Sequence, residues 1–274
     1  MISGKETDMT IGFIGLGNMA KAMIGGILGE NIVSEGSILG YDSLPLARNQ
    51  AAETYGIGIG SNNIDIAHKS DVLILAVKPQ VIEDVIKEIA EHVGEEKLVI
   101  SIAPGKSLEL LQERFKTGSG RKVRIVRCMP NTPALIGEGM TGYCVNEYVT
   151  DEDKSTAVSI LSSFGKAEEV PEKLIPAVTS VSGSSPAYVF ILIEAMADQA
   201  VADGMNRVQA YKFAAQAVLG SAKMVLETGK HPGELKDMVC SPAGTTIEAV
   251  KILEREGFRA AIEDAMEACT EKAR

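Results

Sequence analysis

Gly15, Gly17 and Ala20 form a G-x-G-x-x-A pattern that follows the apolar segment Ile11–Ile14 and opens a helical pattern over Met19–Leu28. A strand that turns sharply into a helix uses the first glycine for the turn and the second for close backbone approach to a ligand. The small third residue lets helix and strand pack together. The helix start then offers free N–H groups and a positive dipole to phosphate oxygens. We therefore expect a dinucleotide-binding α/β domain at this end of the chain.

The periodicity up to about Cys144 supports that fold, because short apolar runs alternate with stretches long enough for helices. Near-continuous apolar strands joined by crossovers are typical of a parallel sheet covered on both faces. The predicted strands are Ile11–Leu16, Ser37–Tyr41, Asp71–Val77, Lys97–Ile102 and Val123–Val126.

The pattern becomes helical further along the chain. A capping box at Thr150 and Asp153 predicts a helix that stops at Gly165, and after about Glu172 no strand pattern remains. The predicted later helices begin at Pro186 behind caps at Ser184 and Ser185, at Asn206 (ending at Gly229), at a capping box of Thr245 and Glu248 (ending at Gly257), and at Phe258 (running to Ala273).

This helical part is rich in Ala and Met and carries apolar residues on more than one face, so one chain supplies too few partners for it. We therefore expect a homodimer through this part. The predicted domains are residues 9–171 and 172–274.

Charge and cysteine usage exclude several classes of function. The 27 Lys and Arg against 37 Asp and Glu give a formal net charge of −10, which disfavours binding to nucleic acid or to anionic membranes. The cysteines and histidines show no metal-ligand spacing, so we expect reduced thiols, no metal and a cytoplasmic protein. No signal peptide is expected in the first eight residues, and no apolar run reaches the length of a membrane span.

Asp42 follows the second predicted strand, where an acidic side chain usually accepts a hydrogen bond from the ribose 2′-hydroxyl and favours NADH. The alternative is that Asp42 only caps the next turn. The nearest arginine is Arg48, so the sequence shows no evident clamp for a 2′-phosphate. Ala76–Pro79 ends another strand and also points to the cofactor, although Lys78 could equally be a solvated charge.

Several motifs identify a family. They are Phe13–Met19, Ala76–Pro79, Met129–Pro133, Val181–Tyr188 and, above all, Leu235–Ile247. With them the chain, from about Met9 to its C-terminus, resembles pyrroline-5-carboxylate reductase. The resemblance implies reduction of the C=N bond of 1-pyrroline-5-carboxylate to L-proline, with NADPH or NADH as hydride donor.

The resemblance also implies an architecture and a set of site residues. The fold is an N-terminal Rossmann-type doubly wound parallel sheet followed by an all-α C-terminal dimerisation domain, with dimers often assembled into rings. The implied cofactor-binding residues are Ile14, Gly15, Leu16, Gly17, Asn18, Met19, Asp42, Asn63, Ala76, Val77, Lys78 and Pro79. The implied substrate-binding residues are Glu172, Asp237, Thr245 and Thr246.

The residues of Ser241–Thr246 suit a substrate carboxylate, because a turn there delivers free N–H groups at a helix start. The Thr246 hydroxyl is the predicted catalytic contact to the ring nitrogen, and simple helix capping is the alternative role. Three residues depart from the family pattern. Ala243 replaces a common glycine, Pro104 replaces an alanine, and Asp42 replaces a small polar or basic residue.

Two other functions compete with this interpretation. One is a 3-hydroxyacid dehydrogenase or another imine reductase, but the dehydrogenases carry a lysine in the first long C-terminal helix and Pro186–Gly204 contains none. The other is a nucleotide-binding sensor without turnover, against which the intact carboxylate-binding loop argues.

Overall fold

The computed structural model describes residues 9–116 and 120–274, which form two compact units. The first unit contains the chain up to Gly183 together with Thr270–Arg274, and the second contains Ser184–Cys269. The compact division therefore lies further along the chain than the predicted division at Glu172.

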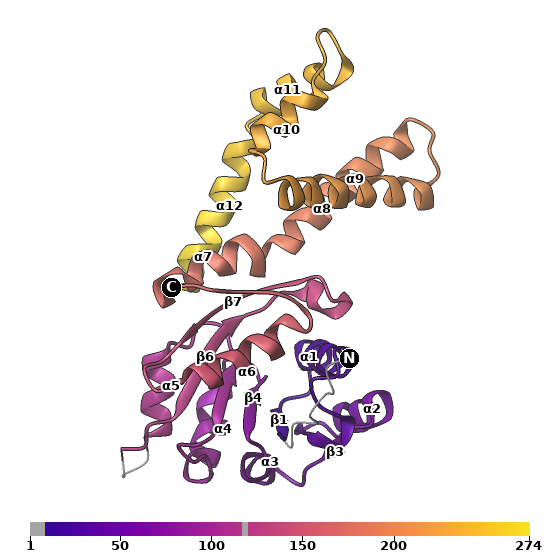
Figure 1. Ribbon diagram of the computed structural model, residues 1–274. Helices are drawn as coiled ribbons and strands as arrows, with labels where there is room; N and C mark the ends of the chain where they lie inside the picture. Colours follow the sequence, from indigo (N-terminus) through magenta and orange to yellow (C-terminus); the bar gives the residue numbers. More distant parts are fainter. Residues whose placement is uncertain (1–8, 117–119) are drawn as a thin grey trace, which may run out of the picture. The chain divides into compact units, whose positions relative to one another are not determined.

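An eight-stranded sheet forms the centre of the first unit, in the order β3-β2-β1-β4-β5-β6-β7-β8 (Figure 1). Every neighbouring pair is parallel except β6 and β7, which are antiparallel. The strands are β1 (Ile11–Ile14), β2 (Ile38–Tyr41), β3 (Gly58–Ile59), β4 (Val72–Leu75), β5 (Leu98–Ser101), β6 (Arg124–Met129), β7 (Gly139–Val145) and β8 (Gly165–Glu169). The α/β class and the five predicted strands are confirmed.

Three strands were not predicted, for physical reasons that their residues explain. β3 is only two residues long, β7 (GMTGYCV) contains two glycines, and β8 (GKAEE) is a polar edge strand. None of these segments shows the apolar run that marks a buried strand. Gly165, predicted to stop the preceding helix, begins β8 instead.

Helices cover both faces of the sheet, which explains why the central strands β1, β4 and β5 are buried along their whole length. Phe13 of β1 points to a core cluster that contains residues of α1 (Asn18–Gly29) and α6 (Asp151–Ser162). The next residue, Ile14, points to the opposite cluster. The other helices of this unit are α2 (Pro45–Tyr55), α3 (Asn63–Lys69), α4 (Ile82–Ile89), α5 (Leu108–Phe115), α7 (Ile175–Val178) and the π-helical turn Thr179–Gly183.

The second unit is entirely helical in its described residues. It contains α8 (Ser185–Ala202), α9 (Arg207–Thr228), α10 (Pro232–Val239), α11 (Thr245–Arg255) and most of α12 (Phe258–Ala273). α8 packs against α9, yet the buried apolar side chains here are all alanines: Ala197, Ala210 and Ala214. Large side chains such as Ile191 (66% exposed) and Phe213 (68%) face outward, as expected for helices that need a second copy.

One long helical stretch is rich in apolar residues, although Glu194 ends its longest uninterrupted run, Ala187–Ile193. The helical stretch Glu172–Ala202 is long and apolar enough to cross a membrane by length and composition, with a mean hydropathy of 1.3 and 11% of its most apolar window buried. An exposed apolar helix is equally what a subunit interface presents before its partner is added.

The predicted helix caps had mixed outcomes. The capping box at Thr150 and the cap at Asn206 are both formed. Ser184 makes no cap hydrogen bond, because its backbone is already helical and the π-helical turn directly precedes it. The capping box at Thr245 is also wrong, because Gly244 is the N-cap and Thr245 is the first helical residue.

All four cysteines are free thiols. Cys128 and Cys144 are buried, and burial raises the pKa of Cys144 to about 11, so this thiol stays protonated near neutral pH. No cluster of His, Cys, Asp or Glu that could hold a metal ion occurs among the residues that the structure describes.

Candidate functional site

A cleft of about 750 Å³ lies at the carboxyl ends of β1, β2 and β4 in the first unit. The parallel register brings Ile14, Tyr41 and Leu75 level with one another, so the loops that follow these strands share one edge of the sheet. The predicted cofactor residues that line the cleft are Ile14, Gly15, Leu16, Gly17, Asp42, Asn63, Ala76, Val77 and Lys78. Asn18, Met19 and Pro79 are not part of its lining.

The glycine loop has the geometry that a pyrophosphate requires. Gly15 has φ +94°, and a Cβ there would lie 2.7 Å from the Ala76 carbonyl oxygen, so only glycine fits. A Cβ at Gly17, by contrast, would meet nothing within 4 Å, which leaves open space beside the backbone. Gly17 is also the N-cap of α1, and no side chain caps this helix start. The N–H groups of its first turn are therefore available to phosphate oxygens.

Asp42 links the two loops that follow β1 and β2. Its Oδ2 accepts a hydrogen bond from the Leu16 N–H (2.9 Å), and its Oδ1 accepts one from the Leu44 N–H (2.9 Å). The turn-capping role is thus realised through Leu44. The same carboxylate also accepts a hydrogen bond from the glycine loop, so Asp42 has a second role besides capping the turn.

The apolar walls of the cleft were not predicted. Leu44 and Leu46 at the start of α2 are 65% and 68% exposed, and Val81 and Val85 line the cleft from the segment after β4. Such side chains suit the faces of an adenine ring. The available sequence pattern was the pair Leu44 and Leu46, which lies three and five residues after the end of β2 at Tyr41.

Glu172 lies in the first unit and is already hydrogen-bonded. Its Oε1 accepts from Arg127 Nη1 (2.6 Å) and from the Leu108 N–H at the start of α5 (2.7 Å). The Arg127 side chain is only 9% exposed, so Glu172 neutralises a cation inside the fold. These contacts give Glu172 a structural role.

We expect Glu172→Ala to lower the free energy of unfolding by about 3 kcal/mol, because it leaves a buried guanidinium unpaired. Glu172→Gln should cost less, since its amide oxygen can still accept from Leu108. Chemical denaturation measures both. The matched control is Lys69→Ala, which removes an exposed ion pair with Asp65 and should cost less than about 1 kcal/mol. A loss for Glu172→Ala no greater than for the control would contradict the structural role.

The other predicted substrate residues lie in the helical unit. Thr245 and Thr246 open α11, and Thr246 is half-buried whereas Thr245 is exposed. No side chain caps α11, so the predicted capping role of these threonines is not realised. The free N–H groups of this helix start can receive a carboxylate. Asp237 near the end of α10 is exposed and pairs with Lys236.

The loop before α11 holds Ala243 in the left-handed region, with φ +56°. The Gly244 N–H donates to the Ser241 carbonyl oxygen (3.0 Å), which closes the turn. A left-handed conformation costs a residue with a Cβ about 1–2 kcal/mol. The departure from the family's glycine therefore strains the loop that delivers the N–H groups.

We expect Ala243→Gly to raise the free energy of unfolding by about 0.5–1 kcal/mol, since relief of the left-handed strain exceeds the added chain entropy. Asn31→Gly is the matched control, because Asn31 has φ 54° but asparagine tolerates this region, so its gain should be smaller. Thermal unfolding measures both. Destabilisation by Ala243→Gly would contradict the strain.

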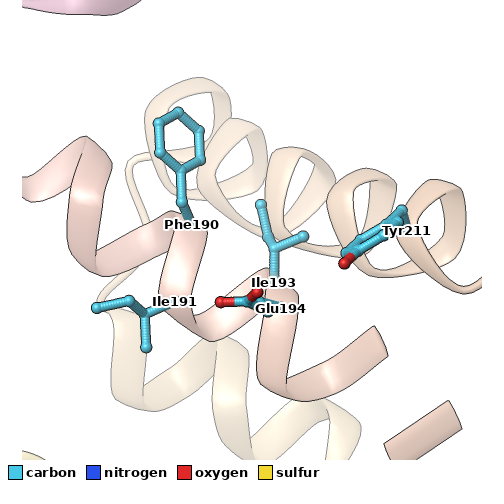
Figure 2. Close-up of a pocket in the computed structure, with 5 residues that line it drawn as sticks. All are labelled: Phe190, Ile191, Ile193, Glu194 and Tyr211. Carbon is cyan, nitrogen blue, oxygen red and sulfur yellow. The ribbon is translucent and has the colours of Figure 1, made fainter. Parts of the chain in front are cut away.

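A second hollow, of about 350 Å³, lies on α8 and α9 within the helical unit (Figure 2). Its lining is mostly apolar and comprises Phe190, Ile191, Ile193, Glu194 and Tyr211. It carries no cluster of polar groups for chemistry, and it adds to the exposed apolar surface of these helices.

The described geometry agrees with comparisons to known proteins. Residues 172–274 match the family described as pyrroline-5-carboxylate reductase dimerisation, and residues 10–105 match NADP oxidoreductase coenzyme F420-dependent. The chain is 51% identical over 265 residues to the pyrroline-5-carboxylate reductase of Escherichia coli, covering 97% of both chains. It is 45% identical to that of Methanosarcina acetivorans, again covering 97% of both.

Solved structures give the same result for the whole chain. The NADP-bound pyrroline carboxylate reductase of Plasmodium falciparum aligns with a TM-score of 0.88 and 32% identity, covering 98% of each chain. The pyrroline-5-carboxylate reductase of Coxiella burnetii aligns with a TM-score of 0.88 and 34% identity, covering 97% of this chain and 98% of that one.

Proposed function

The chain belongs to the pyrroline-5-carboxylate reductase family, and from this premise we propose how its own residues carry out the reduction. The reaction reduces the C=N bond of 1-pyrroline-5-carboxylate to the C–N single bond of L-proline, and forms one new C–H and one new N–H bond. When bound, NADPH or NADH supplies a hydride to the imine carbon. The protein must therefore hold the cofactor, anchor the substrate carboxylate and place a polar group at the ring nitrogen, which gains the proton.

The cleft of the first unit would hold the cofactor. The pyrophosphate would bind over Gly15–Gly17 at the start of α1, and the adenine would lie between the apolar side chains of Leu44, Leu46 and Val81. Asn63, Ala76, Val77 and Lys78 would complete the lining. The cradle at Gly15, which a Cβ would fill, is the observation that supports this fit.

The start of α11 would anchor the substrate carboxylate. Its uncapped N–H groups and the dipole of an 11-residue helix together favour an anion there, with the dipole contributing about 0.3–1 kcal/mol. Thr245 would assist at this position. No lysine or arginine is required, which suits a protein with a net charge of −10.

We assign Thr246 to the ring nitrogen. A threonine hydroxyl is no acid near neutral pH, so its role is to position and stabilise the nitrogen as the proton arrives. Asp237 is proposed as a further polar contact of the substrate. Glu172 was predicted beside them, but its bonds to Arg127 and Leu108 favour an indirect role that supports the fold.

The helical part is a dimerisation domain and the chain forms a homodimer through it. We further propose that dimers assemble into rings, as the family resemblance implies. The proposed domains remain residues 9–171 and 172–274, because the matched dimerisation family starts at Glu172. A cytoplasmic location is proposed from the free cysteines.

The uncapped carboxylate site at α11 is the observation that carries this proposal over a nucleotide sensor. The test mixes purified protein with 1-pyrroline-5-carboxylate and either NADPH or NADH and follows the absorbance of the reduced nicotinamide. We expect oxidation with proline formed in equal amount. Cofactor binding without oxidation of either cofactor would point to a sensor or to another imine.

A further inference from the structure

We propose that Asp42 is the specificity-determining residue of the cofactor cleft and makes this enzyme prefer NADH to NADPH. The inference rests on the proposed function only in taking this cleft as the cofactor site. The position of the carboxylate, its hydrogen bonds and the surrounding cations carry the argument.

Asp42 lies where the adenosine ribose of a bound dinucleotide would be located. It directly follows β2 at the edge where β1 and β2 end, and it lines the same cleft as the glycine loop. A dinucleotide whose pyrophosphate lies on Gly15–Gly17 places its adenosine ribose beyond the second strand. The ribose 2′-position is therefore directed toward Asp42.

Two backbone hydrogen bonds hold the carboxylate in this place. Oδ2 accepts from the Leu16 N–H and Oδ1 from the Leu44 N–H, both at 2.9 Å. Each carboxylate oxygen can accept two hydrogen bonds, so one acceptor site on each oxygen stays available to a ribose hydroxyl. To move out of the way of a 2′-phosphate, Asp42 would have to break both backbone bonds.

The cations in the described lining of the cleft are two lysines, Lys21 and Lys78, and no arginine. The Arg48 guanidinium donates to the Asp42 backbone carbonyl oxygen and lies 5.3 Å from the centre of the Tyr41 ring, outside the lining of the cleft. Lys21 lines the cleft and donates from Nζ to Gln50 Oε1 (2.9 Å). A 2′-phosphate, with a charge of about −1.5 to −2, would therefore face a fixed carboxylate and no arginine fork.

Direct binding tests the proposal without relying on turnover. Dissociation constants for NADH and NADPH are measured by nicotinamide fluorescence, and those for ADP and 2′,5′-ADP by calorimetry. We expect the full chain to bind NADH at least about tenfold more tightly than NADPH, which corresponds to about 1.4 kcal/mol. ADP should likewise bind more tightly than 2′,5′-ADP, which locates the discrimination at the 2′-position.

Variants separate the charge of Asp42 from its shape. Asp42→Asn keeps an acceptor oxygen of similar size but removes the charge, and Asp42→Ser also opens space. Both should reduce the NADH preference about tenfold or more, chiefly by tightening NADPH binding. Asp71→Asn is the matched control: Asp71 also accepts a backbone hydrogen bond, from the Thr10 N–H (2.8 Å), but lies outside the cleft lining. This variant should leave the ratio unchanged.

Equal or tighter binding of NADPH by the unaltered chain overturns the proposal, as does an unchanged ratio in folded Asp42 variants. If those variants fail to fold, the ADP and 2′,5′-ADP comparison on the unaltered chain decides. Failure of the proposed function looks different, because both cofactors would then bind without being oxidised by 1-pyrroline-5-carboxylate.

Discussion

Replacing Thr246 with alanine is expected to lower kcat about 100-fold, a loss typical of removing one hydrogen bond made to developing charge. The dissociation constants of NADH and NADPH should stay unchanged, because Thr246, on α11, is not part of the lining of the cofactor cleft. Steady-state kinetics with 1-pyrroline-5-carboxylate and fluorescence titration of the cofactor measure the two quantities separately.

Two variants sharpen this test. Thr246→Ser keeps a hydroxyl and should recover most of the activity. Thr228→Ala removes the hydroxyl of a threonine that already bonds to the Met224 carbonyl at the end of α9, so it should leave kcat unaltered. An equal loss of turnover and cofactor affinity in Thr246→Ala would refute the local role at the ring nitrogen.

Replacing Ile191 with aspartate is expected to separate the homodimer. Ile191 is 66% exposed in the single chain and belongs to the apolar surface of the helical unit. Full burial of such a side chain contributes about 2 kcal/mol, and a two-fold interface contains the residue twice. The dimer dissociation constant should therefore rise about 1,000-fold.

Sedimentation equilibrium measures this shift toward the subunit mass of 29.1 kDa. Ile59→Asp supplies the matched control, because Ile59 is also an exposed apolar residue (39%) but lies on the edge strand β3 of the first unit. The control should remain dimeric. A dimer of unaltered stability in Ile191→Asp would place the interface on another part of the helical unit.

The parts of the fold that could be predicted are those determined by residues close together in the sequence. The glycine loop could be predicted from the sequence. Gly15 has a left-handed backbone and lies close to Ala76, and only glycine satisfies both requirements. The central strands could be predicted because helices cover both faces of the sheet, so that most of their positions are apolar. The strands β7 and β8 could not be predicted. Glycines interrupt the apolar pattern in β7, and β8 is an exposed edge strand with polar residues.

Individual site residues divide in the same way. The helix start after Gly244 was foreseen as an anion site, although its cap was assigned to the wrong residue. The partners of Glu172 could not be foreseen, because Arg127 and Leu108 are 45 and 64 residues away in sequence. Contacts between residues far apart in the sequence produce no periodic pattern from which they could be predicted.

The sequence by itself determined the α/β class, the dinucleotide loop, the helical second part and the family, because each depends on local residue types or on contiguous motifs. Only the tertiary structure decided that Asp42 bonds both to the glycine loop and to its own turn, and that Glu172 neutralises a buried arginine. It also showed that the helical unit leaves its large apolar side chains outside. These features depend on which segments, distant in the sequence, come into contact in the fold. Local sequence patterns do not predict such contacts.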